Sequence, residues 1–433
     1  METSSPVNKA TTLPSTDNIV REVLPNGIVV LVYENFVTQS VILNGLIQTG
    51  SIFESADKAG LSNIVAGALM RGTHNRDFDT IHETLESLGA SLGIGSGVHT
   101  SGFSGKSLAE DLPTLLNLLS DALRYPSFPI DQTERLRGEI LTGLKIRAQD
   151  TRSVASEAFR KLTYPMDHPY SRNLYGEVET VTAFTLDEMA AFHAANYGPR
   201  GMIIVIVGAV KAEDAIQDVK AIFGDWQNPA QPDVPALPPI ATLYEARQQF
   251  GVVPGKSQSD IILGWVGPSR FAPDFQAANL ANSILGVFGM MGRLGKTVRE
   301  DQGLAYYTGS RVSGGMGPGP WQVSSGVNPA NVYKAIDSIL VEIKRMTNEL
   351  VSEQDLADNK ANFTGRLPLN LESNEGVSSM ILNMEMYNLG LDYLRHYPEM
   401  INAITREQVQ RAAQKYLSST AYVLAVAGPK IER

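Results

Sequence analysis

The chain has 433 residues, more than a single hydrophobic core usually organises, so its length predicts several domains. Its formal net charge of -10 argues against sequence-independent nucleic-acid binding, because such a chain repels polyanions on average. The sequence contains no cysteine and no apolar run long enough to span a membrane. This composition excludes disulfides, thiolate catalysis and cysteine metal sites, and predicts neither a nucleic-acid partner nor a membrane partner.

The beginning of the chain predicts an arm rather than a targeting segment. Residues 1–17 have neither the apolar core of a secretory signal nor the arginine-rich pattern of a transit peptide. We therefore expect a flexible N-terminal arm over residues 1–17 and a cytoplasmic location.

The first half of the chain opens with two apolar segments, "NGIVVLVYEN" and "SVILNGLIQTGS", which predict strands. They are followed by "GLSNIVAGALMRG", residues 60–72, whose apolar spacing is typical of a buried helical face. That face carries Leu61, Ile64, Val65, Ala68 and Leu69. For these five residues, core packing is a sufficient explanation.

The remaining sector of the same helix is unusual. It carries Asn63, Ala66 and Gly67, and a glycine in a helix interior costs about 1 kcal/mol relative to alanine. A second helix is expected at "ERLRGEILTGLKI", which contains Glu139 and Gly143. Periodicity alone gives no reason for Gly67.

A proline-rich segment divides the chain. Residues 226–243, "WQNPAQPDVPALPPIATL", contain five prolines, which disfavour both helix and sheet pairing, so we predict an interdomain linker there. The linker separates an N-terminal domain, residues 18–225, from a C-terminal domain, residues 244–433.

The two domains end alike. Each has a threonine capping box, a helix that ends near a tyrosine, and an apolar strand that closes on glycine. The same number of residues separates Thr185 from Gly208 and Thr405 from Gly428, which indicates a duplicated unit. With "SDIILGWVGPS" as a matching strand in the second half, the pattern predicts an α+β sandwich repeated in tandem.

Several segments, in their order and spacing, resemble the pitrilysin- and insulinase-type metallopeptidases, the group that includes the mitochondrial processing peptidases. They are "LPNGIVVLV", "VILNGLIQTGS", "AGLSNIVAGALMRGT", "NYGPRGMIIVIVG", "KSQSDIILGWVGPSRFAPDF" and "GRLGKTVREDQGLAY". The resemblance implies two homologous α+β domains, each with a mixed, mainly antiparallel sheet covered by helices. It also implies that the chain forms half of a clamshell dimer.

The resemblance gives a reason for the helix at residues 60–72. Active family members carry an inverted HxxEH motif there, with two histidine ligands at the positions of Asn63 and Gly67 and a glutamate base at that of Ala66. Their third zinc ligand falls on Gly143, although Glu139 lies one helical turn earlier. Glycine and alanine have no donor atom in their side chains, so we expect a vestigial site without zinc in this chain.

A second part of the family site is retained. In "TVREDQGLAYYTGSRV" we expect a helix end, a turn at Gly303 and a strand. The resemblance assigns Arg299 to substrate carbonyls and Tyr306 to substrate binding and oxyanion stabilisation, while Tyr307 lies on the opposite strand face. The alternative is that Arg299 is a cation at a helix C-terminus and Tyr306 a half-buried strand aromatic.

Residues that hold a peptide need a metal-bound water opposite them, so the resemblance implies a heterodimer. A zinc-bearing homologous subunit would supply the metal, and the substrate would be a peptide or an unfolded protein. Two alternatives remain: a structural homologue, like the core subunits of a respiratory complex, and a degenerate homodimer that binds peptides.

Two glycine-rich segments have weaker interpretations. Residues 93–97, "GIGSG", and 286–295, "GVFGMMGRLG", lack a complete nucleotide-binding pattern. The second segment occupies the place of a substrate loop in the non-zinc subunit of processing peptidases. A role in guiding substrate would involve Gly286, Gly289 and Gly292. We expect "SGGMGPGPW", residues 313–321, to be a turn between strands.

Overall fold

A computed structural model describes residues 13–431. Its N-terminal half contains a six-stranded sheet in the order β1-β2-β6-β3-β5-β4. Every pairing is antiparallel except that of β2 with β6. The strands are β1 (Ile19–Val23), β2 (Val29–Glu34), β3 (Ser40–Ile47), β4 (Ser91–Ser96), β5 (Ser101–Leu108) and β6 (Ile203–Gly208). β6 is buried along its whole length, as its uninterrupted apolar sequence predicts.

Helices cover this sheet. They are α1 (Leu61–Ala68), α2 (Phe78–Ser87), α3 (Leu112–Arg124), α4 (Ile130–Ala148), α5 (Thr151–Thr163), α6 (Val178–Ala183), α7 (Leu186–Asn196) and α8 (Ala212–Phe223). The five apolar residues predicted for the buried face of α1 are all in the core. Ala66 differs from the expectation, because it is only 1% exposed. α1 packs against α4, α7 and β4, which cover it on more than one side.

The C-terminal half repeats this architecture with a five-stranded sheet in the order β7-β11-β8-β10-β9. Only the pairing of β7 with β11 is parallel. The strands are β7 (Arg247–Val252), β8 (Ser259–Val266), β9 (Ala305–Val312), β10 (Pro320–Val327) and β11 (Val423–Gly428). The helices are α9 (Phe275–Gly286), α10 (Phe288–Leu294), α11 (Val332–Asn348), α12 (Glu353–Asn370), α13 (Asn374–Met386), α14 (Tyr393–Asn402) and α15 (Arg406–Tyr416), with a π-helical segment, η6 (Gly295–Asp301), after α10.

The repeated ends of the two halves form as predicted. Thr185 caps α7 and Thr405 caps α15, each with a complete capping box. The strands that follow, β6 and β11, are interior strands of their sheets and are fully buried. The turn predicted at residues 313–321 is shorter than expected: residues 313–319 connect β9 to β10, and Pro320 and Trp321 already belong to β10.

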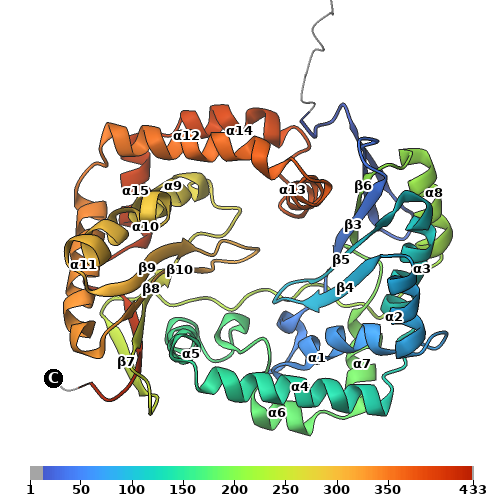
Figure 1. The fold of residues 1–433 in the computed structure, drawn as a ribbon, viewed down its shortest axis with the longest axis horizontal. Helices are drawn as coiled ribbons and strands as arrows, with labels where there is room; N and C mark the ends of the chain where they lie inside the picture. Colours follow the sequence, from blue (N-terminus) through green and yellow to red (C-terminus); the bar gives the residue numbers. More distant parts are fainter. Residues whose placement is uncertain (1–12, 432–433) are drawn as a thin grey trace, which may run out of the picture.

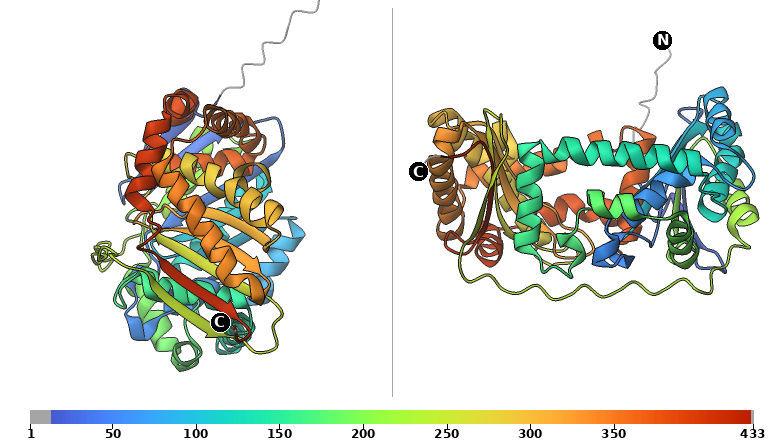
Figure 2. Two further views of the ribbon diagram at one scale, coloured as in Figure 1. Left: turned by 90° about the vertical axis from the view of Figure 1, so that its left-hand side faces the viewer. Right: turned by 90° about the horizontal axis from the view of Figure 1, so that it is seen from below.

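The two halves exchange helices. α5 of the N-terminal half packs on β8 and β11 of the C-terminal sheet, where Ala155 and Phe159 are fully buried. In return, α13 packs on β3 and β6 and inserts Ile381 and Met384. Figure 1 shows α13 beside the N-terminal sheet and α5 near the C-terminal sheet, while α4 runs between the halves in the right-hand view of Figure 2. The halves therefore share two hydrophobic cores.

The segment predicted as a linker contains no helix or strand between the end of α8 and the start of β7, and it passes along the outside of the molecule (Figure 2, right). Of the predicted N-terminal arm, residues 1–12 lie outside the described residues. Within residues 13–17, Thr16 bonds to Asp392 and Asp17 pairs with Arg395. No helix in residues 13–431 is long and apolar enough to cross a bilayer.

Candidate functional site

The helix that carries Asn63, Ala66 and Gly67 is fixed at its first turn by a buried carboxylate. Glu54, 6% exposed, accepts hydrogen bonds from the backbone N–H groups of Gly60 and Ser62. Burial raises the pKa of Glu54 to about 7, although the two backbone hydrogen bonds and the charge of Arg172 oppose that rise. Glu54 therefore caps the start of α1. It is not one of the groups on the side of α1 that carries Asn63, Ala66 and Gly67.

The side of α1 that would carry the family's ligands faces α4 and offers no set of donor groups. A Cβ atom added at Gly67 would lie 3.3 Å from Cδ2 of Leu136, which is almost buried in α4. Leu136 therefore fills the space beside Gly67. Ala66 and Gly67 contribute no donor atom in their side chains, which leaves the Asn63 amide.

The position predicted for the third ligand is also without a donor. A Cβ atom at Gly143 would meet nothing within 4 Å. Glu139, one turn earlier, is engaged elsewhere, since its Oε2 lies 2.6 Å from Nη2 of Arg71. Among residues 13–431 there is no group of three or more histidine, aspartate or glutamate side chains arranged to hold a metal ion. The residues of this chain thus do not fit a zinc site at α1.

Arg299 and Tyr306 lie on consecutive elements of the C-terminal half. Arg299 is in the π-helical segment η6, and Tyr306 is the second residue of the edge strand β9. Gly303, with φ of +60°, makes the turn between them and donates its N–H to the carbonyl of Arg299 at 3.1 Å. Arg299 is exposed and Tyr306 is 59% exposed. Neither makes an ion pair or side-chain hydrogen bond within the described part of the chain, so both are accessible to a ligand.

Tyr307 faces the opposite side of β9, as strand alternation predicts. Its hydroxyl accepts a hydrogen bond from Nε of Arg152 at 2.9 Å and donates one to Asp260. The Arg152 guanidinium also lies 4.0 Å from the ring centroid, and Thr151 bonds to the same buried carboxylate. Burial and the neighbouring Asp260 raise the pKa of Tyr307. This network fastens β9 to the start of α5, which belongs to the other half.

Sequence reasoning missed both Leu136 and this network. The only sequence signal for the network is Asp260, a carboxylate at the start of the otherwise apolar segment "DIILGWV". A charged residue at a buried strand position needs partners, and here they come from α5.

The glycine-rich segment 286–295 forms the end of α9 and the short helix α10. A Cβ atom at Gly286 would lie 2.5 Å from the backbone nitrogen of Ser310, and one at Gly292 would lie 2.5 Å from the carbonyl oxygen of Ile284. Packing therefore explains these two glycines. Gly289 has open space around it, and Met290 next to it is 67% exposed with φ of +51°.

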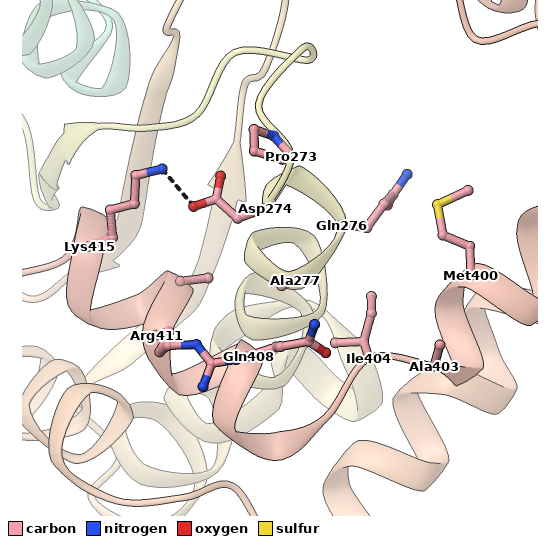
Figure 3. A pocket seen from close by; sticks show the side chains of 11 residues that line it. Pro273, Asp274, Gln276, Ala277, Met400, Ala403, Ile404, Gln408, Arg411 and Lys415 are labelled. Atoms are coloured by element: carbon pink, nitrogen blue, oxygen red, sulfur yellow. Dashed lines mark hydrogen bonds and ion pairs between the residues drawn. The ribbon is translucent and has the colours of Figure 1, made fainter.

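The predicted parts of the site do not meet within one chain. α1 and α4 lie in the N-terminal half, whereas η6 and β9 lie in the C-terminal half (Figure 1). A pocket of about 570 Å³ lies between α9, α14 and α15, and no residue of α1, α4, η6 or β9 lines it. Figure 3 shows the ion pair of Lys415 with Asp274 at one end of it and Met400 at the other. The Asp274 carboxylate in this pocket is already paired with Lys415. None of the predicted site residues lines the pocket.

Two family models match most of the chain. The one described as insulinase (peptidase family M16) matches residues 29–176, and the one described as peptidase M16 inactive domain matches residues 183–363. Two curated relatives are named uncharacterized zinc protease. One, from Mycobacterium leprae, is 24% identical and aligned over 95% of this chain and 92% of its own. The other, YmxG of Bacillus subtilis, is 22% identical over 95% and 98%.

Solved structures have the same fold. A peptidase M16 inactive domain from Pseudomonas fluorescens matches with a TM-score of 0.86 and 26% identity, over 96% of this chain and 99% of that one. A protease from Helicobacter pylori matches with a TM-score of 0.88 and 19% identity, over 96% and 100%. These matches confirm the predicted tandem arrangement of two α+β domains.

Proposed function

Because the chain belongs to the insulinase (M16) family of peptidases, we propose that it is the non-zinc subunit of a heterodimeric zinc peptidase. The observation that carries this proposal is a division within the chain: the helix expected to bind zinc has no set of donors, while Arg299 and Tyr306 remain exposed in the other half. A zinc-bearing homologous subunit would complete the site. Its zinc and the water bound to it belong to that partner.

The side chains of Arg299 and Tyr306 suit peptide hydrolysis in a partner's site. A guanidinium is always charged and offers several N–H donors, so Arg299 can hold backbone carbonyl oxygens of a bound peptide. The Tyr306 hydroxyl can donate one directed hydrogen bond to the oxygen on which negative charge develops. Tyr307, Arg152 and Asp260 would keep β9 in place beneath them.

Two edge strands support a peptide as the ligand. Within residues 13–431, β4 pairs only with β5 and β9 pairs only with β10. Each therefore has backbone N–H and C=O groups along one side that an extended peptide can pair with. The acidic net charge favours peptides over nucleic acids. A cytoplasmic location remains a prediction.

The test is hydrolysis of an unfolded protein or peptide by this chain alone, by a zinc-bearing homologue alone and by their mixture. We expect cleavage by the mixture only. Tyr306→Phe in the mixture should lower kcat/KM by roughly 10²-fold, as expected for removal of a transition-state donor. Arg299→Ala should lower kcat/KM by roughly 10- to 10²-fold, the range for loss of a charged hydrogen bond to the bound peptide. Arg366→Ala and Tyr244→Phe, at exposed positions of α12 and of the segment just before β7, are matched controls that should leave the rate unchanged.

Metal analysis of the purified chain provides a second measurement. We expect no stoichiometric zinc, because the α1 positions lack ligands. Zinc bound to this chain, together with activity in the absence of a partner, would contradict the proposal. A mixture no faster than the homologue alone would favour a structural or inactive peptide-binding role. The relative from Pseudomonas fluorescens, described as an inactive domain, also favours that alternative.

A further inference from the structure

A pocket of about 360 Å³ lies where the C-terminal half passes α13 to the N-terminal sheet. It lies between the start of α9, the end of α12, α13, the start of α14 and the loop after β9. Aromatic, apolar and amide side chains make up most of its lining, and Arg270 is its one charged residue. No carboxylate lines it.

Arg270 is held in place but keeps most of its donors. Its guanidinium lies 4.5 Å from the ring centroid of Phe275 and 5.8 Å from those of Tyr387 and Tyr393. Within the described residues its side chain makes one hydrogen bond, from Nη2 to the Tyr393 hydroxyl at 3.1 Å, and no ion pair. A guanidinium has five N–H donors, so four are left for a ligand or solvent.

The neighbouring polar groups include further free donors. The Tyr393 hydroxyl accepts from Arg270 and, at 2.8 Å, from Nε2 of Gln276. Both of its lone pairs are then used, which leaves its own O–H to be donated, and no acceptor for it lies in residues 13–431. The side-chain amides of Asn279 and Asn370 also make no hydrogen bond within that range. Arg270 is the only charged residue in the lining and has no carboxylate partner there, while the amides offer both donors and acceptors. An anionic acceptor such as an ionised carboxylate can therefore pair with Arg270.

We propose that this pocket binds the C-terminal carboxylate of a peptide whose last residue is aromatic or large and apolar. Arg270 and the Tyr393 hydroxyl would bind the carboxylate. The rings of Phe363 and Tyr397 and the side chain of Leu367 would contact the last side chain. Recognition of a carboxylate follows from the pocket alone, whereas its assignment to a peptide rests on the proposed function.

The test is calorimetric binding to the isolated full chain, which requires no partner. The probes are acetyl-Ala-Gly-Ala-Phe as the free acid, the same peptide as its C-terminal amide, and 3-phenylpropionate. We expect the acid to bind about tenfold more tightly than the amide, the range for a charge-assisted hydrogen bond, and more tightly than 3-phenylpropionate. Equal binding of acid and amide would overturn the proposal. Binding of 3-phenylpropionate as tight as that of the acid would overturn the peptide as ligand.

Variants assign the effect to the pocket. Arg270→Gln should remove the preference for the acid, while Arg366→Gln, the same charge change on the exposed side of α12, should retain it. Tyr393→Phe keeps the ring and loses the donor, so a weaker preference is expected even if Arg270→Gln does not fold. A full preference in either pocket variant would contradict the assignment. If the heterodimer hydrolyses peptides but this chain binds the free acid no better than the amide, only this inference is overturned. If the chain prefers the free acid but the mixture does not hydrolyse peptides, only the proposed subunit role is overturned.

Discussion

Gly67 has a structural neighbour that the sequence could not identify. Its poor fit to a helix interior is visible from the sequence, and the family resemblance predicts that it stands where active members have a histidine. Leu136, which occupies the adjacent space, is far away along the chain. A single sequence contains no signal for such a contact, because helical periodicity identifies a buried face but not what packs on it.

Gly67 and Gly143, the two glycines at the predicted ligand positions, should respond differently to alanine. Gly143 is in the interior of α4, and the methyl group added by Gly143→Ala would lie in open space beside the helix. We therefore expect about 0.5–1 kcal/mol of stabilisation from the higher helix propensity of alanine. Gly67→Ala places the methyl group 3.3 Å from Leu136, and the contact should offset part of that gain. Urea denaturation of both variants measures the difference. A larger gain at Gly67 than at Gly143 would contradict the packing described for α1 and α4.

Glu54 gives stability a pH dependence of defined sign. Its pKa is raised from 4.5 to about 7 in the folded chain, so the folded state binds the proton more tightly than the unfolded state. The contribution is fully present below about pH 4.5 and is lost as the pH rises toward 7, amounting to a few kcal/mol at most. We therefore expect the unfolding free energy to fall between about pH 4.5 and pH 7.

Denaturation of Glu54→Gln over the same pH range isolates this contribution. Glutamine is uncharged throughout, so the fall should be smaller than in the parent chain. Glu83→Gln, at an exposed position of α2, serves as the control and should leave the pH profile unchanged. An identical slope in the Glu54 variant and the parent would rule out the assigned origin.

At the scale of elements, the sequence predicts which residues form a helix or strand better than it predicts which elements pack together. The capping boxes at Thr185 and Thr405 and the strands that follow depend on neighbouring residues, and they form as expected. The crossing of α5 and α13 to the opposite sheets was not predicted, since an apolar helical face fits either sheet. The π-helical geometry around Arg299 was also missed, because α and π segments have similar sequence patterns.

The exchanged helix α5 should contribute strongly to stability. Phe159 is fully buried between α5 and the C-terminal sheet, so Phe159→Ala should cost about 3–5 kcal/mol. Phe36→Ala, at a site 55% exposed, should cost much less. Thermal unfolding of both variants checks this. A small effect at Phe159 would mean that α5 does not join the two halves as described.

At the scale of the whole molecule, the two predicted parts of the site lie in different halves of the tandem repeat. Helix α1, which lacks a set of zinc ligands, packs against the edge strand β4 of the N-terminal sheet. Arg299 and Tyr306 lie at the edge strand β9 of the C-terminal sheet. The resemblance to the family predicted both parts. It could not complete the site, because the missing groups would come from a second chain whose sequence is separate from this one.

The helix exchange also predicts how the chain responds to cleavage of its linker. Residues 232–236 are exposed and lie outside helices and strands, so a protease recognition sequence inserted after Val234 should be cut without disturbing either core. Phe159 of α5 and Ile381 of α13 are apolar side chains that are fully buried against the opposite half. The two fragments should therefore stay together. Size-exclusion chromatography of the cut protein should give one peak at the position of the intact chain. Adding Phe159→Ala should weaken this association, and dissociation of the cut parent chain itself would show that the linker, rather than the exchanged helices, holds the halves together.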